Sequence, residues 1–172
     1  ASLGRSQFDD WLASYEQYRS ALLLNAGLDQ QYHLLRKTQL FTELNAIDLF
    51  VLVRELAPCF ERHNPGDFLF HEIDTAKSAF LVASGEFRIM KESAQDTVVA
   101  TLGPGALTGT AGLLQYGIYN AAMRVATPGE CWRLDEAQLK RLRARSRKID
   151  DRISRELSLP RLENDGLLFQ PN

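Results

Sequence analysis

Apolar residues recur at helical spacing through the first third of the chain, and they predict three helices. The first begins near Ser6 and ends at Asn25-Ala26-Gly27, because glycine tolerates the left-handed conformation of a helix C-cap. The second covers residues 29–37, and the third starts after the N-cap residue Asn45 and ends at Pro58. The apolar positions of the first helix are Phe8, Trp11, Leu12, Tyr15, Tyr18, Leu22 and Leu23.

From Cys59 the pattern changes to short runs rich in valine, phenylalanine and threonine, separated by glycine and proline. The turn signals are Asn64-Pro65-Gly66-Asp67, Ser84-Gly85, Gly103-Pro104-Gly105 and Pro128-Gly129. Strands are predicted at residues 68–71, 78–83, 86–91, 97–102, 121–126 and 131–134. Short strands at regular intervals favour a β-sandwich or a β-roll.

Helical spacing returns after Asp135, which stands in capping-box register with Gln138. The apolar face of this helical stretch consists of Leu139, Leu142, Ile149, Ile153 and Leu157. The predicted fold is mainly β with flanking helices, in the α+β class. We divide it into an N-terminal helical segment (1–57), a β-roll (58–134), and a C-terminal helical segment with a tail (135–172).

Composition supports one soluble domain. The chain has 172 residues, and its 20 Lys plus Arg against 22 Asp plus Glu give a net charge of −2. This balance argues against a protein that coats nucleic acid. The two cysteines form no CxxC pair, which favours a reducing compartment. Neither a run of about 18 apolar residues nor a signal-peptide pattern is found, so we expect a cytoplasmic protein or the cytosolic part of a membrane protein. Because the chain begins at Ala1 without methionine, we interpret it as processed or as a piece of a longer protein.

Five segments occur in the order and spacing of a known family. They are residues 38–44 (TQLFTEL), 64–67 (NPGD), 74–85 (DTAKSAFLVASG), 102–105 (LGPG) and 133–135 (RLD). Over roughly residues 34–157, the chain resembles the cyclic nucleotide-binding domain family. The resemblance implies a β-roll, also described as a double-stranded jelly roll, with an N-terminal helical bundle and a C-terminal helix. One departure is Ile73, which stands where the family has a turn glycine.

The resemblance places a phosphate-binding cassette at residues 103–126. In the family this cassette reads Phe-Gly-Glu, then a helical turn, then Pro-Arg-x-Ala-Thr; the glutamate binds ribose and the arginine binds the cyclic phosphate. Here Thr110 replaces the glutamate, Asn120 replaces the arginine, and Met123 replaces the threonine. The matching ligand-binding positions are Gly109, Thr110, Ala111, Asn120, Ala121 and Ala122. Loss of a buried arginine–phosphate pair costs several kcal/mol, so the cassette is degenerate and ordinary cAMP binding is not expected.

Two arginines are candidates for a substitute phosphate ligand. Strand alternation places Arg124 on the same face as Asn120, although about 13 Å farther along the strand. Arg88 is the second candidate, on another strand. The cassette loop also carries aromatic and apolar residues, Tyr116, Ile118 and Tyr119, which either fill the emptied pocket or stack on a ligand base.

Other kinds of chemistry find little support in the sequence. Cys59, His63 and His71 are the metal-type residues, but their spacing does not suit zinc, so no metal or cofactor is predicted. The acidic pairs Asp9-Asp10 and Asp150-Asp151 diverge on a helix, because adjacent residues do not face each other. Neither a GxSxG motif nor a P-loop occurs, and we predict that the protein is not an enzyme.

A basic run follows the predicted roll. It consists of Lys140, Arg141, Arg143, Arg145, Arg147 and Lys148. Its interpretations are a solvated helix face, a contact surface for an acidic partner or anionic membrane, and a DNA-binding surface. Nucleic acid is the least favoured, because the chain has no room for a helix-turn-helix. A homodimer through Ile149, Ile153 and Leu157 is a further hypothesis.

We therefore predict a non-catalytic regulatory or signalling module that acts within or beside a larger protein, such as a transporter, channel or signalling enzyme. Its partner would be the remaining domain of a longer chain or a separate protein. Two alternatives stay open. One is a true sensor of a cyclic mono- or dinucleotide, or another small ligand, through an altered pocket. The other is the ligand-sensing half of a DNA-binding transcription regulator.

Overall fold

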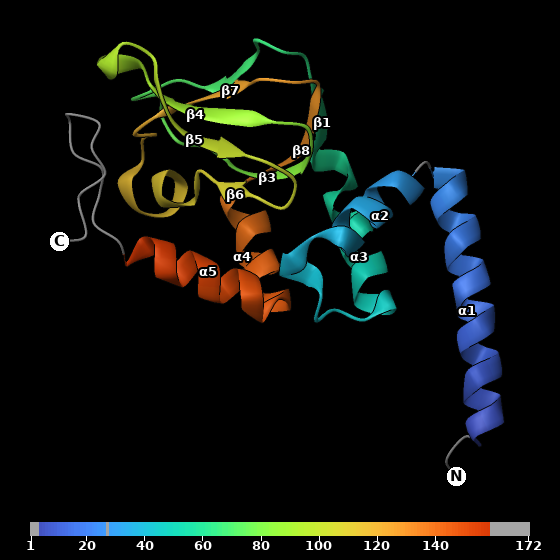
Figure 1. Cartoon of the computed structure of the whole chain (residues 1–172). Coiled ribbons are helices and arrows are strands. Elements are labelled where there is room, and N and C mark those ends of the chain that lie inside the picture. Colours follow the sequence, from blue (N-terminus) through green and yellow to red (C-terminus); the bar gives the residue numbers. More distant parts are fainter. Residues whose placement is uncertain (1–3, 27, 159–172) are drawn as a thin grey trace.

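Two four-stranded antiparallel sheets lie face to face in the computed structural model, which describes residues 4–26 and 28–158 (Figure 1). Sheet A has the order β1-β8-β3-β6, and sheet B has the order β2-β7-β4-β5. The strands are β1 (Phe60–His63), β2 (Phe68–Phe70), β3 (Ala79–Ser84), β4 (Phe87–Lys91), β5 (Thr97–Leu102), β6 (Leu107–Thr108), β7 (Ala122–Val125) and β8 (Gly129–Leu134). This arrangement confirms the predicted β-roll.

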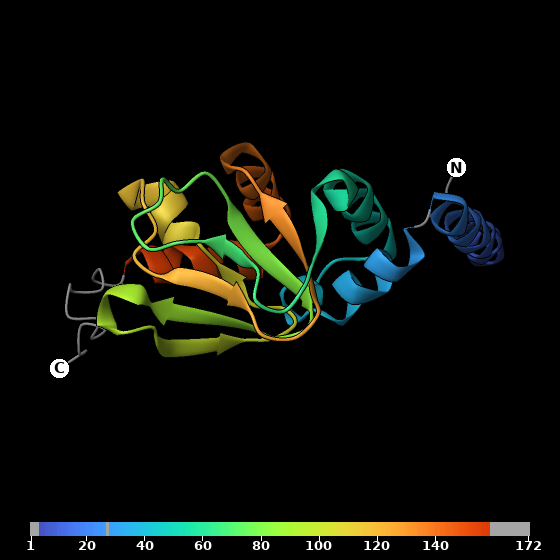
Figure 2. The ribbon, with the colours of Figure 1, turned by 90° about the horizontal axis from the view of Figure 1, so that it is seen from above.

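Helices cover the outer face of sheet A and leave the outer face of sheet B uncovered (Figure 1). The helices are α1 (Arg5–Ala26), α2 (Asp29–Lys37), α3 (Ala46–Leu56), α4 (Glu136–Arg145) and α5 (Arg147–Leu157). Shorter helical turns are η1 (Gln39–Phe41), η2 (Ala57–Cys59), η3 (Glu92–Ala94) and η4 (Gly112–Tyr116). Both views place α1 away from the roll, beside the other N-terminal helices (Figure 1, Figure 2). None of the described helices is both long and apolar enough to cross a membrane.

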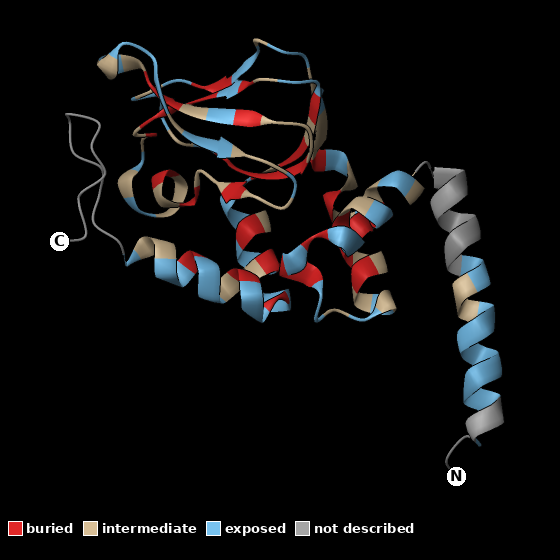
Figure 3. Ribbon diagram, viewed as in Figure 1, coloured by how far each residue is buried: buried red, intermediate tan, exposed pale blue. Residues whose placement is uncertain are grey.

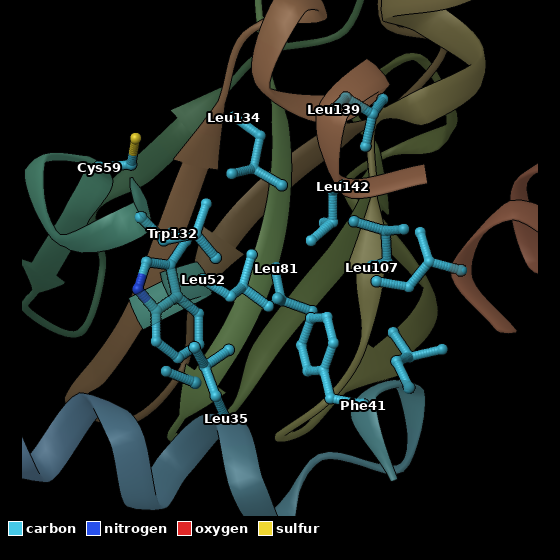
Figure 4. Close-up of a cluster of buried hydrophobic side chains, with 14 of the residues drawn as sticks. Leu35, Phe41, Leu52, Cys59, Leu81, Leu107, Trp132, Leu134, Leu139 and Leu142 are labelled. Carbon is cyan, nitrogen blue, oxygen red and sulfur yellow. The ribbon is translucent and has the colours of Figure 1, made fainter. Parts of the chain in front are cut away.

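The larger hydrophobic cluster lies between sheet A and the helices, where buried positions gather in Figure 3. Side chains from α2, η1, α3 and α4 meet those of the sheet in Figure 4: Leu35, Phe41, Leu52, Leu81, Leu107, Trp132, Leu134, Leu139 and Leu142. Trp132 and Leu81 are neighbours across the β3–β8 ladder and have no exposed surface. One cluster therefore joins the N-terminal helices, the roll and the C-terminal helices.

The second cluster fills the space between the two sheets. Phe80 and Val82 of β3 point into it, while Leu81 points the other way, toward the helices. Sheet A is thus covered on both faces, which explains why β3 is an almost uninterrupted apolar run rather than an alternating one. Sheet B contributes Met123 and Val125 of β7 to the same cluster.

Helix starts match the predicted capping residues. The Asn45 side chain accepts a hydrogen bond from the Asp48 backbone N–H at 2.8 Å. Asp135 and Gln138 form the complete capping box that begins α4. Ser146 separates α4 from α5, and its hydroxyl accepts from the Ile149 backbone N–H at the start of α5.

The structure differs from the prediction in two places, and a third prediction is not tested. Strands β1 and β6 were not predicted, because β1 reads Phe-Glu-Arg-His and β6 has only two residues. The proposed dimer face on the last helix is wrong, because Ile149 and Ile153 are fully buried in the chain's own core and Leu157 packs against it. The predicted helix stop at Gly27 and the tail after residue 158 lie outside the described residues.

Candidate ligand-binding site

The cassette runs from the turn before β6, through η4, to β7. Gly109 has a φ of +82°, and a Cβ there would lie 3.2 Å from the Ser78 carbonyl oxygen. Gly112 is equally confined, since a Cβ would lie 2.9 Å from the Ile118 carbonyl oxygen. A side chain at either position would force the loop to move, so these glycines fix the path of the cassette.

Thr110, which the sequence resemblance predicts at the position of the family's ribose-binding glutamate, is fully buried. Its hydroxyl has no hydrogen-bond partner within ordinary distance among the described residues. The same hydroxyl interacts favourably with the carboxyl of Glu156 on α5, although burial outweighs this and raises the pKa of Glu156. Thr110 therefore faces the C-terminal helix and joins the cassette to it.

Asn120, which the sequence resemblance predicts at the position of the phosphate-binding arginine, meets a buried cation through its backbone. Lys91 is buried, with 4% of the residue exposed. Its ammonium group donates a hydrogen bond to the Asn120 carbonyl oxygen at 2.7 Å. Lys91 also pairs with the Glu72 carboxylate at 2.7 Å. The positive charge that contacts the Asn120 backbone is thus already paired with a carboxylate of the protein.

Glu72 is held in its charged form by this arrangement. Its carboxylate accepts hydrogen bonds from the Ser93 backbone N–H at 3.0 Å and the Ser93 hydroxyl at 2.8 Å. Burial would raise the pKa of Glu72, but Lys91 and Ser93 outweigh burial and lower it to about 2. Sequence reasoning missed Lys91 and Glu72, although the inward-facing alternation of Phe87, Ile89 and Lys91 was available as a signal.

The ring of Tyr119 lies inside the roll. It stacks on Phe70 with ring centroids 3.8 Å apart. Its hydroxyl donates to the Ser78 carbonyl oxygen at 2.6 Å and accepts from the Ser78 N–H at 3.2 Å. Burial raises the pKa of the Tyr119 phenol. Of the two predicted roles for the cassette aromatics, this geometry favours filling of the interior; Tyr116 and Ile118 are only partly buried.

Arg88 and Arg124, predicted as substitute phosphate ligands, lie directly opposite each other on β4 and β7. Both are exposed, whereas Met123 beside them points between the sheets. The Arg124 guanidinium lies 5.5 Å from the centre of the Phe68 ring, and Arg88 lies 3.6 Å from the Glu86 carboxylate. Both guanidinium groups thus point away from the interior of the roll, so this geometry does not favour either as a phosphate ligand there, and their role stays a prediction.

The basic run divides into paired and unpaired residues. Arg143 pairs with Asp150 at 2.9 Å, and Arg145 pairs with Glu55 at 2.6 Å. The Lys148 ammonium contacts the Thr42 hydroxyl, and Glu43 accepts from the Lys148 backbone N–H. Among the described residues, the other four cations of this run form no ion pair: Lys140, Arg141, Arg147 and Lys148.

Cys59, His63 and His71 do not come together. The Cys59 thiol accepts from the Gln138 side chain at 2.7 Å. His71 pairs with Glu92 at 3.0 Å and stacks on Phe68. His63 lies apart from both, beside the carboxylates of Glu61 and Asp67.

Comparisons with known proteins agree with this geometry. A family model described as the cyclic nucleotide-binding domain matches residues 60–146. Among solved structures, the chain is similar to the regulatory subunit of a cAMP-independent protein kinase A from Trypanosoma brucei, with a TM-score of 0.59 and 15% identity. It is also similar to the regulatory domain of Toxoplasma gondii protein kinase A with cAMP, with a TM-score of 0.53 and 22% identity. A third is the N-terminal domain of a transcriptional regulator from Streptomyces coelicolor, with a TM-score of 0.55 and 21% identity.

The extent of these matches differs. The similarity to the two kinase regulators covers 74% and 68% of this chain but only 44% of each of those chains. For the Streptomyces domain it covers 73% of this chain and 94% of the other. No protein with a curated description matches the sequence. At these identities, the structural likeness establishes the fold.

Proposed function

Because this chain belongs to the cyclic nucleotide-binding domain family, we propose that it is a non-catalytic regulatory module whose cassette no longer binds cAMP in the usual way. The family match and the fold supply the regulatory part of this proposal. The altered cassette supplies the rest. The resemblance places Thr110 where the family has its ribose-binding glutamate, and Asn120 where it has its phosphate-binding arginine.

The observation that carries the proposal is the filled interior beside the cassette. The Tyr119 ring stacks on Phe70, and its hydroxyl donates a hydrogen bond to the Ser78 carbonyl oxygen. A nucleotide that needed this space would have to displace the ring and break both hydrogen bonds to Ser78. It would find no free cation there either, because Lys91 is paired with Glu72.

The proposed regulatory movement involves the C-terminal helices. Thr110 of the cassette faces Glu156 of α5, so a shift of the cassette changes the surroundings of a buried carboxyl on that helix. The exposed cations Lys140, Arg141 and Arg147 lie on α4 and α5 and would face an acidic partner or another domain of a longer chain. The two helices are therefore the part of the fold that we expect to report a change in the roll.

Calorimetric titration with cAMP and cGMP tests the proposal. We expect no heat of specific binding up to millimolar nucleotide. Micromolar binding would overturn the proposal and favour a true sensor with an altered pocket, an alternative in keeping with the cAMP in the Toxoplasma gondii domain.

A further candidate is the sensing half of a transcription regulator. It is favoured by the Streptomyces coelicolor domain, nearly all of which is covered by the match. The longer reading frame of the native protein distinguishes this candidate from the proposed regulatory module, because a transcription regulator of this kind would carry a DNA-binding domain after the roll.

A further inference from the structure

Three potential metal ligands meet at the edge of sheet A, on the side that faces sheet B. Glu61 and His63 are alternate residues of β1, so their side chains lie on the same face of the strand. Cys131 of β8 is directly opposite Glu61 in the ladder. The ligand atoms of the three residues all lie within 4.8 Å of one another.

The surrounding groups orient these ligands. The Arg133 guanidinium donates to one oxygen of Glu61 at 2.8 Å, which leaves the other oxygen directed at His63. The second ring nitrogen of His63 lies 3.9 Å from the Asp67 carboxylate. At metal sites a carboxylate often lies beside the far nitrogen of a ligating histidine, because it keeps the proton on that nitrogen and leaves the near one available to the metal.

We propose that Glu61, His63 and Cys131 form a binding site for a divalent cation that favours mixed sulfur, nitrogen and oxygen ligands, such as Zn²⁺. Calcium and magnesium are poor candidates, because they require six or more oxygen ligands. Three protein ligands leave the fourth tetrahedral position to water. A thiolate and a carboxylate supply two negative charges to the metal, while Arg133 on Glu61 and Asp67 beside His63 add one charge of each sign.

Binding exchanges protons for the metal. Without metal, the His63 Nε2 atom and Glu61 Oε1 atom are 3.0 Å apart and share a hydrogen bond. The cation takes the place of the proton on Nε2, and the neutral His63 ring then carries its proton on Nδ1, which faces Asp67. The Cys131 thiol loses its proton to solvent as the sulfur–metal bond forms, so no oxidant or reductant is required.

The site is open on one side and closed on the other. The side chains of Glu61 and His63 are 32% and 18% exposed, which gives the cation a route from solvent. Cys131 is fully buried at the inner end. Ligand atoms around tetrahedral zinc lie about 3.5 Å apart, and no two ligand atoms of this cluster are more than 4.8 Å apart.

Titration of the whole reduced chain with Co²⁺ tests the proposal, because a cobalt–thiolate bond gives a charge-transfer band in the near ultraviolet and tetrahedral cobalt gives visible bands. We expect both to appear at one equivalent and to be removed by added Zn²⁺. Absence of these bands in the wild-type chain overturns the proposal.

The two cysteines provide a matched control. We expect Cys131→Ser to abolish the charge-transfer band and Cys59→Ser to retain it, since the Cys59 thiol bonds Gln138 on the other side of the sheet. A band that survives Cys131→Ser overturns the assignment. Because Cys131 is buried and its variant can unfold, His63→Gln provides a second test: Co²⁺ binding should weaken at least tenfold, while His71→Gln leaves it unchanged. Equal effects of the two histidine variants overturn the site.

Discussion

The Ser146 hydroxyl donates a hydrogen bond of 2.8 Å to the backbone carbonyl of Leu40. Ser146 lies between α4 and α5, and Leu40 belongs to η1 in the N-terminal segment, so this bond joins the two helical ends of the chain. The same hydroxyl caps α5. A fully buried serine thus fixes the position at which the last helix turns away from the roll.

Replacement of this serine is expected to loosen the last helix. Ser146→Ala removes the cap and leaves the Leu40 carbonyl buried without its partner, which should lower the free energy of unfolding by about 2–3 kcal/mol. Urea denaturation measures the change. The control Ser158→Ala removes an exposed hydroxyl near the other end of α5 and should change stability by less than about 0.5 kcal/mol. Equal effects of the two substitutions would show that the Ser146 bonds contribute little.

The filled interior predicts how Tyr119 contributes to stability. Tyr119→Phe keeps the ring on Phe70 but removes both hydrogen bonds to Ser78, for an expected loss of about 1–2 kcal/mol. Tyr119→Ala also creates a cavity, for an expected loss of about 3–5 kcal/mol. Thermal unfolding followed by circular dichroism measures both. A Tyr119→Ala variant as stable as the wild type would contradict the packing described here.

Restoration of the family's cassette residues should create nucleotide affinity. Because Glu156 faces position 110, a glutamate introduced there alone would meet a second carboxyl. We therefore expect the triple variant Thr110→Glu, Asn120→Arg, Glu156→Gln to bind cAMP at least tenfold more tightly than the wild type, as measured by calorimetry. Glu156→Gln alone is the control and should gain nothing. A folded triple variant without a gain would mean that the cassette alignment is wrong or that Tyr119 still occupies the space the nucleotide needs.

Glu72 predicts a loss of stability in acid. Its pKa is about 2 in the folded chain, below its ordinary value of 4.5, so between these values the unfolded chain binds more protons and unfolding becomes easier as pH falls. This difference in pKa corresponds to about 3 kcal/mol of the free energy of unfolding. That contribution is present above pH 4.5 and is lost as the pH falls toward 2. Urea denaturation at several pH values measures it.

The matched variant separates this carboxylate from the others. Glu72→Gln should reduce the acid dependence of stability, and at pH 7 it should destabilise the fold, because the buried Lys91 loses its partner. Glu86→Gln, which affects an exposed pair with Arg88, should leave the acid dependence unchanged. An unaltered pH profile in Glu72→Gln would contradict the assignment.

Ile73 occupies a backbone conformation that suits glycine. The φ of Ile73 is +66°, and the residue is 75% exposed. The resemblance places a glycine of the family at this turn. Ile73→Gly relieves the left-handed strain of a β-branched residue and removes no buried contact, although it gives the unfolded chain more freedom. We expect a net gain of about 0.5–1 kcal/mol in thermal or urea unfolding. Ile73→Val keeps the branching and should give no gain; a destabilised Ile73→Gly would refute the strain argument.

The sequence predicted most of the fold because the main signals are local. The Asp135 capping box and the glycine turns depend on residues a few positions apart, and six of the eight strands were anticipated. Strand β1 was not predicted, because its central residues, Glu61 and Arg62, are charged and do not give an apolar strand pattern. An edge strand accommodates such charges.

The sites were harder to predict because they depend on pairings across the chain. Lys91 meets Asn120 through the β4–β7 ladder, and Cys131 meets Glu61 through the β1–β8 ladder. The sequence grouped His63 with Cys59 and His71, which are near it in sequence but point elsewhere in space. Strand alternation likewise could not say which face of β7 carries Arg124, because that face is set by packing between the sheets.

The strand order also has a consequence for synthesis on the ribosome. Strand β8 lies between β1 and β3, and β7 lies between β2 and β4, so each sheet is joined by one of the last strands to be made. Until β7 has left the exit tunnel, β2 lacks its strand partner, and until β8 has followed, β1 lacks its own. The nascent chain therefore closes its roll late, and it is most exposed to wrong pairing or to chaperones while residues 60–121 wait for their partners.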